Sequence, residues 1–335
     1  MGMRMARVAS WAVCAGWLLG MTACDSSDGS GPAPYPAGSR QAGDNGGSSQ
    51  QPDPSQSKGG DEDAPPAKCS LDTPFVESVF PETPESGINT DADEGLPRLT
   101  SDELVLYFHR GTTIYRAARA SRDESFGAAT ALSRPNDTPD SPQPARDAFP
   151  TNGDARIYFA AQTSSLELQV AERSGAGLEN PRPVLGFDPP ISNSVSAPFL
   201  WKSTLFFTMA GADGQHLWSG EVGADGALLA LPSKLPSVAR AGGAEKDPTL
   251  SEDGLVLLYF GDAGAGAGGV WLATRTDTNQ PFSNPRALDV PGKTGRWIAP
   301  GFLSSDYCRL YVYRESEPGS NRGDLALLTR TPPPP

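Results

Sequence analysis

The sequence predicts an all-β chain built from one repeated unit, and three observations lead to this prediction. A short strand-like segment with an aromatic centre recurs five times, at steps of 48 to 53 residues. A turn-forming segment precedes it in the clearest copies, and a second strand-like segment that ends in Arg follows it in four copies. Short strands separated by turns and repeated about every 50 residues are typical of propeller blades. We therefore predict a β-propeller of five four-stranded blades, with six blades as the alternative.

The chain begins with features of an exported protein. Arg4 and Arg7 precede an apolar run of about a dozen residues, which is too short to cross a hydrocarbon core of about 30 Å. The run ends in Leu-Leu-Gly-Met-Thr-Ala before Cys24. This ending resembles the signal of bacterial lipoproteins, although Met21 stands where that family usually has Leu. The resemblance implies that residues 1–23 are a removable signal peptide; a conventional secretory signal with an incidental cysteine is the alternative.

The same resemblance implies a lipid anchor. In that family the cysteine after the signal carries acyl chains such as palmitate, which makes Cys24 the lipidation site here. Residues 24–67 are rich in Gly, Ser, Pro, Asp and Gln, so we predict a disordered tether with a reach of about 35 to 40 Å. Two or more acyl chains hold a protein stably on a membrane. We therefore expect a lipid-anchored protein of the cell envelope, in the periplasm or on the outer-membrane surface.

The charge of the chain excludes one class of partner. The formal net charge is −13, and the Lys and Arg residues are scattered along the sequence. Binding to nucleic acid depends on clustered cations that neutralise phosphates. We expect no nucleic-acid partner.

The folded part, residues 68–331, contains the repeats. The aromatic strands are expected at 105–108, 156–159, 204–207, 257–260 and 309–312. Innermost strands followed by Ser-x-Asp-Gly-type turns are expected just before them, and third strands just after them, closed by Arg119, Arg173, Arg275 and Arg330. The recurrence of these arginines predicts a shared structural contact with turn carboxylates. Segments such as Phe126 to Leu132 and Phe282 to Leu288 are expected to form the outer fourth strands.

The repeat, with its order Pro-x-Leu-Ser-x-Asp-Gly, Leu-Tyr-Phe, Trp-x-Ala-x-Arg and Phe, resembles the TolB-type, or WD40-like, propeller repeat. The resemblance covers residues 69 to 330 and implies a propeller. It implies no single function, because such propellers serve as binding platforms, protease gates and enzyme scaffolds. Six blades are common in that family, but the length of the repeat region leaves no room here for a sixth blade of about 51 residues.

The ends of the repeat region predict how the ring closes. Within residues 69 to 80, the segment Pro74 to Val79 matches the outer-strand pattern but precedes the first full repeat, and the last repeat stops after its third strand. We infer that these residues supply the fourth strand of the last blade, which removes exposed sheet edges. Cys69 and Cys308 would then lie at the same seam, and an exported chain favours a disulfide between them. Residues 332–335 form a Pro-rich tail beyond the last blade.

Few residues in the repeats point to chemistry. His109 and His216 have no supporting cluster of ligands or nucleophiles in the sequence, so we expect structural roles at blade edges, no metal site, no cofactor and no catalytic triad. Asp147 and Asp247 occupy equivalent positions just before innermost strands, where Leu96, Ala197 and Ala299 stand in the other blades. These two carboxylates are candidates for binding at the mouth of the channel.

We expect a membrane-tethered binding or scaffolding module with a protein or glycan ligand on one face of the propeller. The alternative is a glycoside-processing enzyme, because some five-bladed glycosidases carry their acid and base carboxylates on inner strands. Binding is preferred to catalysis here, since two acids in five copies also fit a degenerate repeat. An open pocket around the carboxylates would favour the enzyme, and a mouth filled by apolar side chains would argue against it.

Overall fold

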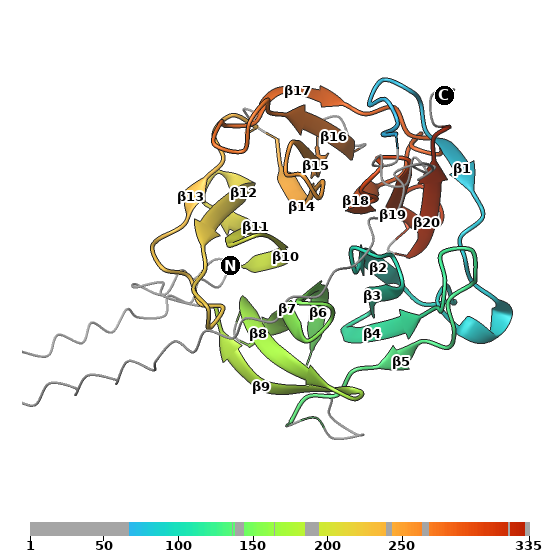
Figure 1. Ribbon diagram of the computed structural model, residues 1–335, viewed down its shortest axis with the longest axis vertical. Coiled ribbons are helices and arrows are strands. Elements are labelled where there is room, and N and C mark those ends of the chain that lie inside the picture. Colours follow the sequence, from blue (N-terminus) through green and yellow to red (C-terminus); the bar gives the residue numbers. More distant parts are fainter. Residues whose placement is uncertain are drawn as a thin grey trace, which may run out of the picture. The chain divides into compact units, whose positions relative to one another are not determined.

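The computed structural model describes residues 67–135, 137, 144–163, 165–184, 194–238, 243–262, 268–320 and 322–331. These residues form five four-stranded antiparallel sheets placed around a common axis, as Figure 1 shows. The predicted five-bladed β-propeller is confirmed, and the described residues contain no sixth blade. In this part of the chain no helix is long and apolar enough to cross a membrane. Cys24, the signal peptide, all but the last residue of the tether and the tail at 332–335 lie outside it and stay predictions.

In each blade the first strand lies nearest the axis (Figure 1). The first strands are β2 Glu94–Leu99, β6 Ala145–Thr151, β10 Val195–Trp201, β14 Glu245–Leu250 and β18 Ile298–Leu303. The second strands are β3 Val105–Arg110, β7 Arg156–Gln162, β11 Thr204–Gly211, β15 Val256–Gly261 and β19 Arg309–Glu315. The third strands are β4 Thr113–Ala118, β8 Leu166–Ser174, β12 Gly214–Glu221, β16 Gly269–Thr274 and β20 Gly323–Thr329. The outer strands are β5 Thr130–Ala131, β9 Gly177–Pro183, β13 Ser233–Lys234, β17 Ser283–Ala287 and, in the last blade, β1 Val76–Ser78, which is followed by a short 3-10 helix, Pro84–Ser86.

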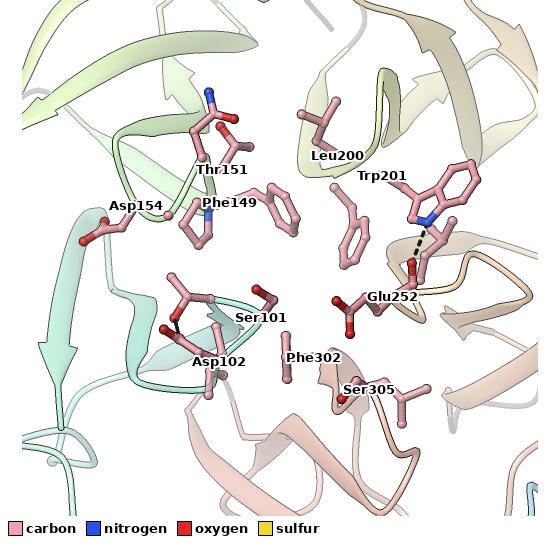
Figure 2. Close-up of a pocket in the computed structure, with 18 of the residues that line it drawn as sticks. Ser101, Asp102, Phe149, Thr151, Asp154, Leu200, Trp201, Glu252, Phe302 and Ser305 are labelled. Carbon is pink, nitrogen blue, oxygen red and sulfur yellow. Dashed lines mark hydrogen bonds between the residues drawn. The ribbon is translucent and has the colours of Figure 1, made fainter. Parts of the chain in front are cut away.

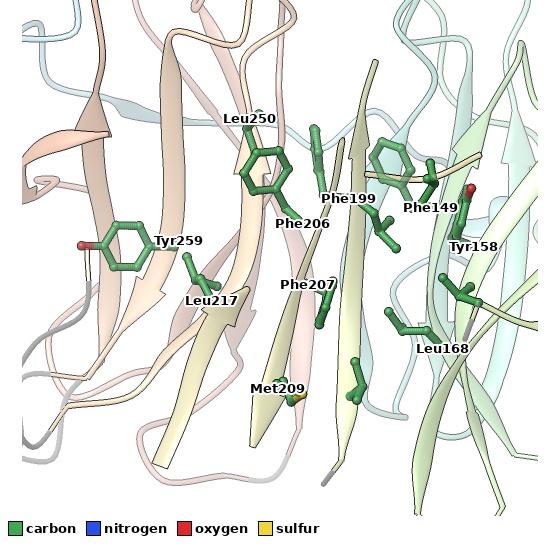
Figure 3. Packing of buried hydrophobic residues seen from close by; sticks show 14 of the residues in the cluster. Phe149, Tyr158, Leu168, Phe199, Phe206, Phe207, Met209, Leu217, Leu250 and Tyr259 are labelled. Carbon is green, nitrogen blue, oxygen red and sulfur yellow. The ribbon is translucent and has the colours of Figure 1, made fainter. Parts of the chain in front are cut away.

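The second strands carry the core because neighbouring blades cover both of their faces. Tyr107, Tyr158, Tyr259 and Tyr311, the repeated aromatic residues, are each at most 1% exposed. Figure 3 shows Phe206 and Phe207 of β11 between Tyr259 of the next blade and Phe149 and Tyr158 of the preceding one. Burial of such aromatic side chains supplies most of the favourable free energy that holds the ring together.

A bulge interrupts every first strand at the same place. The register shifts on either side of it, for example between Arg146 and Phe149 in β6. In four blades one bulge residue has a positive φ, and these residues are Leu96, Asp147, Ala197 and Asp247, with φ of 46°, 58°, 50° and 57°. Asp147 and Asp247 therefore lie inside β6 and β14 and not before them, which corrects the expected strand starts. The bulge allows pairing with the second strand to resume beyond it.

Three of the four recurring arginines, Arg119, Arg275 and Arg330, stack on an aromatic ring of the fourth segment. The guanidinium carbon of Arg119 lies 4.5 Å from the ring centroid of Phe126, and that of Arg275 lies 4.4 Å from that of Phe282. Their Nε atoms donate to main-chain carbonyls of the turn between the first two strands. The predicted partner was a turn carboxylate, but only Arg173, which donates to Asp154, has this contact among the four.

The outer strand of the first blade is shorter than expected. Only Thr130 and Ala131 pair with β4, although the pattern predicted a strand from Phe126 to Leu132. The reason is a competing partner, since the amide of Phe126 donates to the carbonyl of Pro81 at 2.8 Å. The segment that follows β1 and contains Pro81 thus covers the first part of the outer edge of the first blade.

The ring closes by strand exchange between the two ends of the repeat region, as predicted. β1 pairs antiparallel with β20, with Val76 opposite Thr329 and Ser78 opposite Leu327. A disulfide joins Cys69 to Cys308, with 5.2 Å between their Cα atoms. The predicted seam between the first and last elements of the ring is therefore covalently closed.

Gly301 marks the closest approach between the last and first blades. A Cβ atom at this position would lie 2.2 Å from the carbonyl oxygen of Pro97, a main-chain atom that cannot move aside without shifting β2. We expect Gly301→Ala to lower the free energy of unfolding by about 1–3 kcal/mol, a typical cost of overpacking. Urea unfolding followed by fluorescence measures this. Gly269→Ala is the matched control, because no atom lies within 4 Å of its Cβ position; equal effects of the two substitutions would contradict the contact.

Candidate functional site

One repeat position from each blade converges on the propeller axis. These positions are Arg98, Phe149, Phe199, Thr249 and Phe302, the first residue beyond the bulge to pair with the second strand in each blade. Arg98 is fully buried and is their centre. Its guanidinium donates to the Thr249 hydroxyl and the Gly301 carbonyl, both at 2.7 Å, and to the Pro248 carbonyl at 2.9 Å. The side chain from the first blade is therefore hydrogen-bonded to the fourth and fifth blades across the axis.

Two aromatic rings pack against this guanidinium. We call Arg98, its hydrogen-bond partners and these two rings the plug. The guanidinium carbon of Arg98 lies 5.1 Å from the Phe199 centroid and 5.9 Å from the Phe149 centroid. Burial lowers the pKa of Arg98 to about 10, although the charges of Asp247 and Asp147 oppose this shift. The group therefore remains charged at neutral pH, and its charge is spread over hydrogen bonds and π faces.

A cavity of about 360 Å³ lies above the plug, where the first strands end and turn into the second strands. We call it the turn-face pocket. Its floor is apolar and includes Leu99, Phe149, Phe199, Leu250 and Phe302. Figure 2 shows Phe149 and Phe302 reaching toward its centre from different blades. The mouth of the channel on this face is thus filled by apolar side chains.

The rim of the turn-face pocket is polar and comes from the five turns. Two of its three carboxylates are engaged. Asp154 accepts hydrogen bonds from Arg116 and Arg173, and Asp102 accepts them from its own turn. Glu252 is exposed and projects its side chain into the pocket (Figure 2). The rim also carries hydroxyl and amide groups that can donate and accept, at Thr100, Ser101, Thr151, Asn152, Ser251 and Ser305.

The two carboxylates predicted from the sequence do not line the turn-face pocket. Asp147 is 7% exposed, and its Oδ1 lies 3.3 Å from Nδ1 of His109. Burial alone would raise the pKa of Asp147, but contacts with His109 and Arg146 outweigh it and lower that pKa. Burial raises the pKa of Asp247, and the negative charge of Asp147 adds to the effect. The structure thus brings the two aspartates into electrostatic contact near Arg98 but away from the pocket.

His216 is also paired with a carboxylate. Its Nδ1 lies 2.6 Å from Oε2 of Glu245 at the start of β14, and both side chains are buried. This pair joins the third and fourth blades, which fits the structural role predicted for the histidines. Among the described residues no group of three or more His, Cys, Asp or Glu side chains could hold a metal ion.

Comparisons with known proteins extend the description of the fold. No protein-family model and no curated protein sequence matches the chain. A thermostable family-43 glycoside hydrolase is similar in structure, with a TM-score of 0.54 and 13% identity over 76% of this chain and 98% of that one. The endo-arabinase from Bacteroides thetaiotaomicron has a TM-score of 0.50 and 14% identity, also over 76% of this chain and 98% of that one. The likeness is one of fold.

TolB proteins are also among the structural neighbours. TolB from Acinetobacter baumannii gives a TM-score of 0.41 and 14% identity over 73% of this chain and 55% of that one. This value is too low to support an argument about function. The propeller therefore has neighbours with and without glycosidase names, and its own side chains must carry the functional argument.

The first residue of the folded part lies beside the turn-face pocket. Lys68 forms an ion pair with Asp253, and Tyr307 donates to the same carboxylate at 2.6 Å. Asp253 follows Glu252 in the turn of the fourth blade, and Ser305 in the turn of the fifth blade also lines the pocket. Lys68, the disulfide seam and the pocket therefore share one face.

Asp253 predicts a pH dependence of stability. Burial would raise its pKa, but hydrogen bonds from Lys68, Ser251 and Tyr307 outweigh burial and lower the pKa below its usual range. A carboxylate whose pKa is lowered by folding stabilises the folded state at pH values above its unfolded-state pKa of about 4. This stabilisation is lost as the pH falls toward the lowered pKa of the folded state. We expect the melting temperature to fall less steeply between pH 5 and pH 2 in Asp253→Asn than in the parent chain. Asp123→Asn, at an exposed position, is the control; identical slopes for the parent chain and Asp253→Asn would contradict the prediction.

Proposed function

We propose that the chain is a membrane-tethered binding module and that its ligand occupies the turn-face pocket. One observation carries the proposal: the pocket has a polar rim and an apolar floor with aromatic rings, two of which pack against the buried Arg98. Pockets of this volume with apolar walls and a few convergent polar groups are typical ligand sites. Two of the three rim carboxylates are held by other groups, which leaves no free pair of carboxylates among the described residues that line the pocket. These features favour binding over catalysis.

The membrane part of the proposal rests on Cys24 and the lipoprotein-type signal before it. Because Lys68 contacts the turn face, a lipid at Cys24 would be joined to the propeller on the side that carries the pocket. We expect Cys24→Ala to move the chain from the membrane pellet to the soluble fraction and to abolish labelling by a palmitate analogue. Unchanged labelling of this variant would contradict lipidation at Cys24.

The binding proposal can be tested with one pocket variant. Ser101 is exposed, labelled in Figure 2 and part of the pocket rim. A tryptophan there would fill the pocket without disturbing the core. Glycan and peptide arrays probed with residues 25–335 should give signals that Ser101→Trp removes and Ala128→Trp, at an exposed position on the outer edge, retains. Signals that survive Ser101→Trp would place the ligand elsewhere.

A second candidate function has an observation in its favour. The environments of Asp147 and Asp247 push their pKa values in opposite directions, and paired carboxyl groups with separated pKa values can divide the roles of base and acid. Since similar folds include an endo-arabinase, aryl arabinofuranosides are the first substrates to test. Hydrolysis that disappears in Asp147→Asn and in Asp247→Asn would support an enzyme. A parent chain that hydrolyses these substrates no faster than the variant with both substitutions would reject this function.

A further inference from the structure

A second hollow adjoins the turn-face pocket. A groove of about 250 Å³ lies between the third and fourth blades, lined by residues of β11, β12 and β13 on one side and by the segment 275–282 on the other. Trp201 lines both this groove and the turn-face pocket. The two hollows therefore meet at a single aromatic side chain.

Trp201 is held in place from several sides. Its indole Nε1 donates to the carbonyl of Glu252 at 2.9 Å, which links the turns of the third and fourth blades. The guanidinium carbon of Arg275 lies 5.1 Å from its ring, and Nζ of Lys202 lies 4.5 Å from it. Figure 2 shows Trp201 at the edge of the pocket with its indole extending away from Phe149. The ring is therefore positioned to contact a ligand that leaves the pocket for the groove.

The groove offers hydroxyl and aromatic groups and no carboxylate. Its lining includes Thr204, Ser219, Ser233 and Thr278 together with aromatic rings such as Phe282. Lys234 pairs with Asp213 at 2.8 Å, and Arg275 donates through Nε and Nη1 to the carbonyls of Gly254 and Thr278, which leaves its Nη2 without a hydrogen-bond partner among the described residues. A surface of this kind complements an uncharged ligand that has many hydroxyl groups and some apolar faces.

We infer that the turn-face pocket and the groove together bind one linear, uncharged oligosaccharide. One sugar would occupy the pocket, the chain would cross Trp201, and the following sugars would lie in the groove. A sugar ring presents C–H groups on its faces and hydroxyls at its edge, which matches an aromatic floor with a hydroxyl-bearing rim. The inference rests on the proposed binding function and adds the ligand class and the direction of the chain.

The experiment compares chain lengths. Residues 25–335 are titrated with neutral oligosaccharides of two to six units, taken from arabinan, xylan, β-1,4-glucan and N-acetylglucosamine series. We expect affinity to rise about tenfold, or about 1.4 kcal/mol, between the two-unit and four-unit members of one series, because the longer members reach the groove. Ser233→Trp, at an exposed groove position, should reduce this ratio to below about threefold and leave the two-unit affinity within about twofold. Ala128→Trp should change neither value.

Each other outcome overturns the inference in a distinguishable way. If Ser101→Trp abolishes binding but Ser233→Trp leaves the length dependence intact, the pocket binds and the groove does not, so the proposed function stands alone. If binding survives both substitutions, the proposed function fails as well. No binding of any series at about 1 mM, or binding of peptides in place of sugars, overturns the ligand class.

Discussion

Replacing Arg98 with methionine is expected to lower the free energy of unfolding by about 3–5 kcal/mol, since each buried acceptor left without a donor costs about 1–3 kcal/mol. The guanidinium is fully buried and makes three hydrogen bonds to the fourth and fifth blades. Methionine fills a similar volume but leaves the Thr249 hydroxyl and the carbonyls of Gly301 and Pro248 without this donor. Denaturation in urea, followed by circular dichroism, measures the change.

Two further variants show whether hydrogen bonding across the axis is the cause. Arg98→Lys keeps the charge but cannot reproduce the two-armed contact, so it should fall between the parent chain and Arg98→Met. Arg322→Met removes an arginine that is half exposed and pairs with Asp91 at 3.6 Å, and it should have little effect. A loss in Arg98→Met no larger than that in Arg322→Met would show that the plug does not hold the blades together.

Loss of the disulfide is the second large effect. Cys69 and Cys308 are separated by 239 positions, so the bond closes almost the whole propeller into a covalent ring. Closing so long a loop limits the unfolded chain and contributes up to about 5 kcal/mol in the chain-entropy description. We expect the double variant Cys69→Ala, Cys308→Ala to unfold at a lower urea concentration, with a loss of about 2–5 kcal/mol.

The double variant is preferred because a single substitution leaves a free thiol that can link two chains. A reducing agent should destabilise the parent chain by a similar amount and leave the double variant unchanged. A parent chain that resists reductant while the double variant is weakened would assign the effect to packing around Cys69 and Cys308, which are 2% and 6% exposed.

The fold could be predicted from the sequence because every blade has the same order of strands and turns, and this order recurs as a pattern in the sequence. Aromatic segments such as Leu257 to Phe260 are buried on both faces in every copy, so their pattern survives differences in the loops. The closing strand was predictable for the same reason, since residues around Phe75 match an outer strand that the last repeat lacks. The position of Asp147 within its strand was not, because a bulge with positive φ leaves no clear mark in the sequence.

The candidate site was largely hidden from sequence reasoning. Arg98, Phe149, Phe199, Thr249 and Phe302 share one repeat position, but their side chains are of three different kinds. Only closure of the ring sets the first blade opposite the fourth and beside the fifth, so that Thr249 and Gly301 become the partners of Arg98. Comparing the five blades position by position would have marked this residue set as lying nearest the axis. The role of Trp201 depends on the packing of two blades and has no signal in the repeat.

We expect the turn-face pocket, and not the pair of aspartates deeper along the axis, to hold the ligand. Calorimetric titration of the strongest array ligand against two variants tests it most directly. Ser101→Trp should abolish binding, while the double variant Asp147→Asn, Asp247→Asn should bind within about threefold of the parent chain, because neither aspartate lines the pocket. Binding that survives Ser101→Trp and is lost in the aspartate variant would contradict the account.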